Sequence, residues 1–106
     1  MPKYLTRVSF TQEGVKGLQK HNATQRRAAV AKMVESAGGK LEAFYFAFGP
    51  DDGIAIYDLP DNVTAASMSI AANAAGHVRL SFTPLMTVEE MDQAIAKSSK
   101  FHPPGG

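Results

Sequence analysis

The sequence predicts an α+β fold in which a four-stranded antiparallel sheet packs against helices. Four segments alternate apolar and polar side chains with a period of two, which is typical of strands. Other segments place apolar residues three and four positions apart, which is typical of helices. The turn-rich residues 49–53 indicate that two of the strands form a hairpin.

Residues 3–10 are expected to form the first strand, because apolar and polar side chains alternate along them. This alternation places Arg7 and Ser9 together on the more polar face. A strand face of this kind holds either a buried cation or an open, wet surface. Arg7 is therefore the first candidate for a functional residue.

The region after the first strand is expected to contain one or two helices. Thr11 is suited to cap a helix, but Gly14 and Gly17 weaken its opening turns, so an irregular segment is the alternative. Thr24 offers a second helix start, and residues 38–39 are two glycines that would end that helix. Its core-facing stripe consists of Val30, Met33, Val34 and Ala37.

Two cations, Arg26 and Arg27, lie at the beginning of this second helix. They oppose the helix macrodipole, at a cost of about 0.3 to 1 kcal/mol each. One interpretation is that they extend to solvent or pair with Asp51 or Asp52 of the turn. The other is an anion site in which the arginines and the free helix amides contact the anion.

Residues 40–48 are expected to form the second strand, and both of its faces are largely apolar. The alternation places Phe44, Phe46 and Phe48 on one face and Tyr45 with small or aliphatic residues on the other. One face can take helices of the same chain, whereas the face led by the phenylalanines needs a partner. We therefore expect a homodimer or a higher homo-oligomer.

Residues 54–59 return as the third strand, which Pro60 stops. Asp61 is suited to cap a helix over residues 62–75. This helix is rich in alanine and serine, which lets it lie close to the sheet, and Gly76 ends it. Residues 77–85 are expected to form the fourth strand.

Thr87 and Glu90 match a capping box and predict that a last helix begins there. The apolar stripe of this helix is narrow and consists of Val88, Met91 and Ile95. Residues 101–106 are expected to be a flexible tail. The order of elements is the ferredoxin-like βαββαβ arrangement with an added C-terminal helix, in a single domain over residues 1–100.

The polar faces of the first and fourth strands become neighbours in such a sheet, and together they carry Arg7, Ser9, His77 and Arg79. Two arginines cannot satisfy each other, so they need an acid, water or an anionic ligand. One interpretation is solvent exposure or a salt bridge between subunits with Glu42. The other is a site for a small carboxylate or phenolate, in which His77 moves a proton near neutral pH.

Composition excludes several classes of function. The chain has no cysteine, and its histidines show neither metal-ligand spacing nor a triad signature, so we expect no metal and no cofactor. A net charge of +1 does not indicate the strongly basic surface that binds nucleic acid or an anionic membrane. The absence of a membrane-length apolar run and of a signal-peptide core predicts a cytoplasmic protein.

Several short motifs occur together: Thr-x-x-Gly after the first strand, an arginine in the helix, Gly-Gly before the second strand and Gly-x-Val-Arg at the entry to the fourth. Their positions are Thr11, Gly14, Arg26 or Arg27, Gly38, Gly39, Gly49, Asp52, Pro60, Asp61 and residues 76–79. Over residues 4–97 the chain thereby resembles the GYD domain family. That family has a Gly-x-Tyr-Asp turn before the third strand. Gly49 and Asp52 match this turn, but Asp51 stands in place of its tyrosine, so no role of the tyrosine is carried over. The resemblance implies a dimeric α/β barrel, in which two sheets pack face to face, and no assigned activity.

Two functions from different classes follow. The first is an oligomeric binding or structural module with a small anionic ligand in the barrel. The alternative is a cofactor-independent oxygenase or isomerase of the dimeric α/β-barrel kind, with His77 as the base. A hydrophobic pocket reached by His77 favours the enzyme, and a filled interface favours the module.

Overall fold

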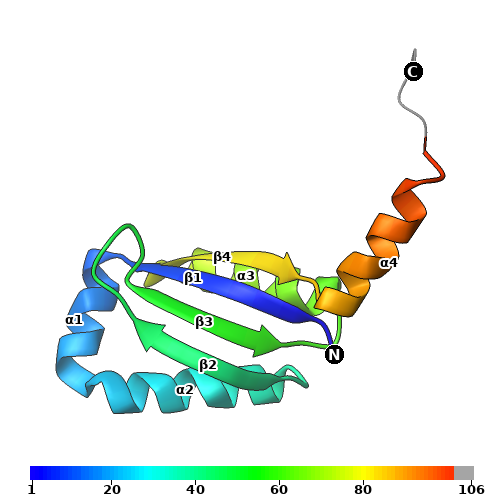
Figure 1. Ribbon diagram of the computed structural model, residues 1–106. Coiled ribbons are helices and arrows are strands. Elements are labelled where there is room, and N and C mark those ends of the chain that lie inside the picture. The colour runs from blue at the N-terminus through cyan, green and yellow to red at the C-terminus, as the bar shows by residue number, and fades with distance from the viewer. Residues whose placement is uncertain (102–106) are drawn as a thin grey trace.

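The computed structural model describes residues 1–101, so the predicted tail lies, except for Phe101, outside the described residues. Figure 1 shows a sheet with helices against it and a last helix that leaves the body of the protein. The elements are β1 (Lys3–Phe10), α1 (Gln12–His21), α2 (Ala23–Ser36), β2 (Lys40–Phe46), β3 (Gly53–Asp58), α3 (Asn62–Ala75), β4 (Val78–Leu85) and α4 (Val88–Ser98).

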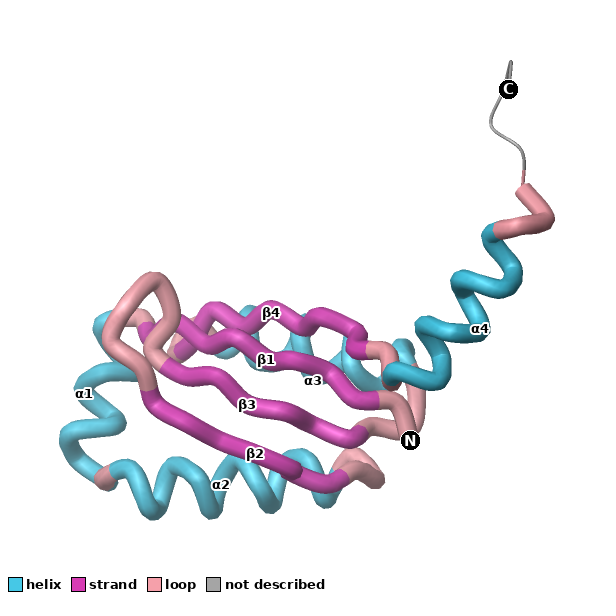
Figure 2. The backbone as a smooth tube through the Cα atoms, viewed as in Figure 1, coloured by secondary structure: helices cyan, strands magenta, loops and turns pink. Residues whose placement is uncertain are grey.

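The sheet has the strand order β2-β3-β1-β4, and every neighbouring pair is antiparallel. This order and the two helical crossovers confirm the ferredoxin-like α+β fold. Figure 2 shows α2 and α3 on one side of the sheet, where residues of both helices meet the core. No helix of residues 1–101 covers the other side, which we call the open face.

The core lies between the sheet and these two helices. Its largest fully buried side chains are Tyr4, Val34, Tyr57 and Leu59. Phe82 of β4 packs edge-on against both tyrosines, with ring centroids 6.3 and 5.8 Å apart. Burial of each large side chain stabilises the fold by roughly 1.5 to 3 kcal/mol.

Local sequence signals explain the helix boundaries. Asn22 has a φ of 82° and closes α1, while its side chain accepts a hydrogen bond from the amide of Gln25. The helix α2 therefore begins one residue before Thr24. The segment after Thr11 is a regular helix, so of the two alternatives the irregular one is wrong. Residues 62–75 and the Thr87–Glu90 capping box agree with the prediction.

A β-bulge between Leu41 and Ala43 corrects the predicted faces of β2. The extra residue reverses the alternation, so Phe44 lies opposite Ala55 and packs against the core. Phe46 lies beside Phe44 on the same side, with ring centroids 5.1 Å apart. The expectation that phenylalanines lead the open face is therefore wrong, and Phe48 lies beyond the end of β2.

The open face is instead apolar through other residues. They alternate with the core residues of β1, β2 and β3 and are Leu5, Ala43, Tyr45, Ile54 and Ile56. Tyr45 and Ile54 are opposite each other in the ladder, and both are exposed. The sheet thus has an apolar face that is open to water, but the residues that form this face differ from those predicted.

Helix α4 extends away from the body of the protein (Figure 1). The molecule measures 58 × 28 × 23 Å and has a radius of gyration of 17.0 Å, where a compact chain of this length has about 13 Å. None of the residues of α4 is buried, and its apolar stripe is 75% exposed at Val88, 49% at Met91 and 60% at Ile95.

Candidate functional site

The open face brings three of the four predicted ligand-binding residues together. Arg7 and Ser9 of β1 lie opposite Ser81 and Arg79 of β4 in the antiparallel ladder. They border a hollow of about 230 Å³ beside Asp51. An acid in the same hollow opposes the binding of a second anion there. Within residues 1–101, Asp51 makes no ion pair shorter than 4 Å with either arginine.

His77 does not join this group. It lies one residue before β4, so the predicted start of that strand was one residue early, and its side chain is exposed. Its carbonyl oxygen accepts hydrogen bonds from the amide and hydroxyl of Thr11, at 3.2 and 3.0 Å. His77 lines neither the hollow nor the cavity described next.

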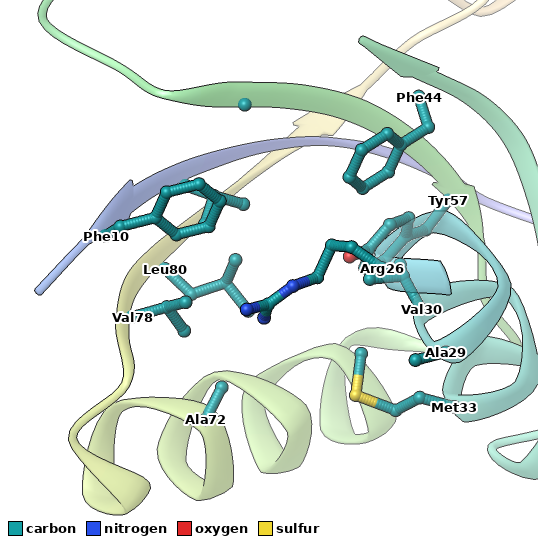
Figure 3. A pocket seen from close by; sticks show the side chains of 12 residues that line it. Phe10, Arg26, Ala29, Val30, Met33, Phe44, Tyr57, Ala72, Val78 and Leu80 are labelled. Atoms are coloured by element: carbon teal, nitrogen blue, oxygen red, sulfur yellow. The ribbon is translucent and has the colours of Figure 1, made fainter. Parts of the chain in front are cut away.

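A cavity of about 200 Å³ lies on the opposite side of the sheet, between the strands and helices α2 and α3. Figure 3 shows its walls, which are apolar except for two side chains. They include Phe10, Phe44, Val30 and Leu80, together with Arg26 and Tyr57. Sequence reasoning missed this cavity. The small residues Gly53 and Ala72 in its wall leave the space that larger side chains would fill.

Arg26 is the charged residue in this wall. Its guanidinium lies over the ring of Phe10, 5.3 Å from the centroid, and donates a long hydrogen bond of 3.5 Å to the carbonyl oxygen of Gly14. Among residues 1–101, no carboxylate lies within 4 Å of it. Pairing with Asp51 or Asp52, one of the alternatives considered for these arginines, is therefore not formed.

Asp52 is used elsewhere, because its carboxylate accepts a hydrogen bond of 2.8 Å from the amide of Phe10. The neighbouring Arg27 is exposed and lies beside the edge strand β2, near Phe44 and Tyr45. The two arginines that the sequence could not tell apart thus have different surroundings. Only Arg26 faces the cavity.

Tyr57 supplies the second polar group. Its side chain is 1% exposed, and Figure 3 shows the hydroxyl pointing into the space between the labelled side chains. Burial raises the pKa of Tyr57 to about 12, so the hydroxyl keeps its proton at neutral pH. Within the described residues this hydroxyl has no hydrogen-bond partner of its own.

Residues 1–101 contain no group of three or more histidine, aspartate or glutamate side chains arranged to hold a metal ion. None of the helices in that range combines the length and hydrophobicity that crossing a bilayer requires.

The fold and these surfaces define a small ferredoxin-like α+β protein with an open sheet face and an apolar cavity. A family model described as the GYD domain matches residues 4–95. The chain therefore belongs to the GYD domain family, as its motifs predicted. Neither the curated proteins nor the solved structures include a significant match to it.

Proposed function

We propose that the protein is a homodimeric binding module in which a second copy covers both the open face and α4. The observation that carries this proposal is the exposed apolar stripe of α4. An isolated helix of 11 residues is marginal in water, because it forms too few hydrogen bonds to offset its nucleation. Its stripe of Val88, Met91 and Ile95 is suited to pack on another protein surface.

The open face adds the area that a stable dimer needs. Four strands about 4.8 Å apart and about seven residues long give a face of roughly 450 Å². One side of α4 adds roughly 250 Å². Together they approach the roughly 800 Å² per partner that a standard interface buries. Two sheets packed in this way would form a dimeric α/β barrel.

The charges of the open face support contact with an identical copy. Lys3 bonds both Glu42 and Asp58, at 2.9 and 2.8 Å, so this corner has two carboxylates for one ammonium group. Arg7 and Arg79, on the same face, have no such partner within residues 1–101. A two-fold axis can place these arginines of one protomer near the acidic corner of its partner.

Sedimentation equilibrium tests the proposal. The native protein is expected to have twice the mass of its 11.3 kDa chain at micromolar concentration. Ile54→Glu places a charge on the open face and should weaken dimerisation at least tenfold, because a buried unpaired charge is costly. Ile70→Glu is the matched control, since Ile70 is exposed on α3, away from the open face.

A second pair of variants tests α4. Ile95→Glu changes the apolar stripe, and Gln93→Glu makes the same charge on another side of the helix. Only Ile95→Glu should weaken the dimer. A native protein that sediments as a monomer, or equal effects of both variants in each pair, would contradict the proposal. The enzyme alternative gains no support from the geometry, because His77 does not reach the cavity.

A further inference from the structure

We propose that the cavity between the sheet and helices α2 and α3 binds a small aromatic monocarboxylate. Its carboxylate would contact Arg26 and Tyr57, and its apolar body would fill the remaining space. The inference names a site and a ligand class for the proposed binding module. It rests on that role but not on the dimer, because the cavity lies on the helix-covered side of the sheet.

Arg26 is the anchor for the carboxylate. A guanidinium carries five N–H donors in a planar fork that matches a carboxylate. Here one N–H group of Arg26 donates a long hydrogen bond to the carbonyl oxygen of Gly14, and the guanidinium lies over the ring of Phe10. The ring of Phe10 removes water from one side of the guanidinium. Within residues 1–101 no carboxylate pairs with Arg26 to compensate for that lost hydration. An acidic ligand would supply the missing counter-charge.

Tyr57 provides a second donor to the same oxygen atoms. Tyr57 lines the cavity, and its hydroxyl can donate one hydrogen bond. Because the hydroxyl points into the cavity, a ligand oxygen held by Arg26 can accept its hydrogen bond as well. The phenol stays protonated at neutral pH and therefore acts as a donor toward an anion.

The walls select the rest of the ligand. Phe10, Phe44 and the ring of Tyr57 are aromatic faces, and Val30 and Leu80 complete an apolar lining. A cavity of about 150 Å³ takes benzene in a well-studied case, so about 200 Å³ takes one ring with a short acidic group. Phosphate would lose its hydration against apolar walls without gaining enough donors.

Calorimetric titration with phenylacetate tests the site on the native protein. Phenylacetate is expected to bind at millimolar concentration or below, whereas the neutral phenylacetamide should bind at least tenfold more weakly. Inorganic phosphate, which tests for simple attraction of anions, should not compete. Equal binding of the acid and the amide would contradict the role of the cation, and no binding of phenylacetate would contradict the site.

Matched variants locate the binding. Arg26→Met keeps the apolar stem and removes the charge, and it should weaken phenylacetate binding at least tenfold. Arg27→Met removes the neighbouring arginine, which lies outside the cavity, and should leave binding unchanged. Ala72→Leu fills the space without altering charge and should abolish binding. Equal losses in Arg26→Met and Arg27→Met would overturn the proposal.

These outcomes are separate from the oligomeric state. Sedimentation reports the dimer, and titration of a folded monomeric variant such as Ile54→Glu reports the cavity by itself. If Ile54→Glu is monomeric and still binds phenylacetate, both proposals stand. If the native protein is a dimer but does not bind phenylacetate, only the proposed ligand site is contradicted.

Discussion

Gly14 lies directly against the carbonyl group of His77, so closely that a side chain at position 14 has no room. Thr11 joins the same contact, because its amide and hydroxyl donate to the His77 carbonyl oxygen. The hydroxyl also donates to the carbonyl oxygen of Gly76 at 2.8 Å. The Thr-x-x-Gly motif and the segment before β4 thus pack and hydrogen-bond together, and this contact fixes α1 against the sheet.

This contact predicts opposite effects on stability for two alanine substitutions in α1. Gly14→Ala should destabilise the protein by about 1 to 3 kcal/mol, because the new Cβ must displace the backbone of His77. Gly17→Ala should stabilise it by about 0.5 to 1 kcal/mol, because the new Cβ would make only an ordinary van der Waals contact, 3.6 Å from Arg26 Nη2, and alanine is the better helix former. Urea denaturation measures both. If both substitutions changed the free energy of unfolding in the same direction, contact with His77 would not explain the effect of Gly14→Ala.

The fold could be predicted because its signals are local. Helix caps, paired glycines and the period-two pattern each depend on a few neighbouring residues, and they gave the element order. The bulge after Leu41 was not predictable, because a single extra residue leaves the composition of the strand unchanged while it reverses every following side chain. Phe44 and Phe46 were therefore assigned to the wrong face.

The candidate site was only partly predictable for a related reason. Strand order correctly placed Arg7 and Arg79 near each other, because antiparallel neighbours follow from the fold. The cavity depends on how far two helices stand from the sheet, which no local pattern records. Its sequence signal was the unfavourable position of Arg26 at a helix start, and that signal fitted Arg27 equally well.

Thr6 offers a test of core packing. Its side chain is buried, and its hydroxyl has no hydrogen-bond partner. Thr6→Val removes this hydroxyl and should stabilise the protein by about 1 kcal/mol, because an unpaired buried polar group is costly. Thr6→Ser keeps the hydroxyl, loses a methyl group and should destabilise by about 1 kcal/mol. Thermal unfolding of both variants checks the pair, and a less stable Thr6→Val would contradict it.

Tyr57 predicts a loss of stability in alkaline solution. Burial raises its pKa from 10.0 to about 12, so the folded state holds the proton more tightly than the unfolded state. This contribution is complete below pH 10 and is lost as the pH rises toward 12, at about 1.4 kcal/mol per pH unit. The free energy of unfolding should therefore fall more steeply in the native protein than in Tyr57→Phe over this interval. Parallel slopes would rule out this cause.

Asp61 predicts the corresponding behaviour in acid. Its carboxylate accepts hydrogen bonds of 2.8 Å from the amide and the hydroxyl of Thr64, and these bonds lower the pKa of Asp61 below its ordinary 3.8. Because the folded state favours the charged form, the contribution is present above pH 3.8 and is lost as the pH falls through the folded pKa.

Asp61→Asn isolates that effect. Asparagine caps a helix about as well as aspartate but does not titrate, so the variant should lose less stability than the native protein between pH 5 and pH 2. Asp61→Ala removes the cap and should be less stable than Asp61→Asn at neutral pH. Urea unfolding followed by circular dichroism at several pH values measures both differences. An acid transition of equal steepness in the native protein and Asp61→Asn would assign the pH dependence to other carboxylates.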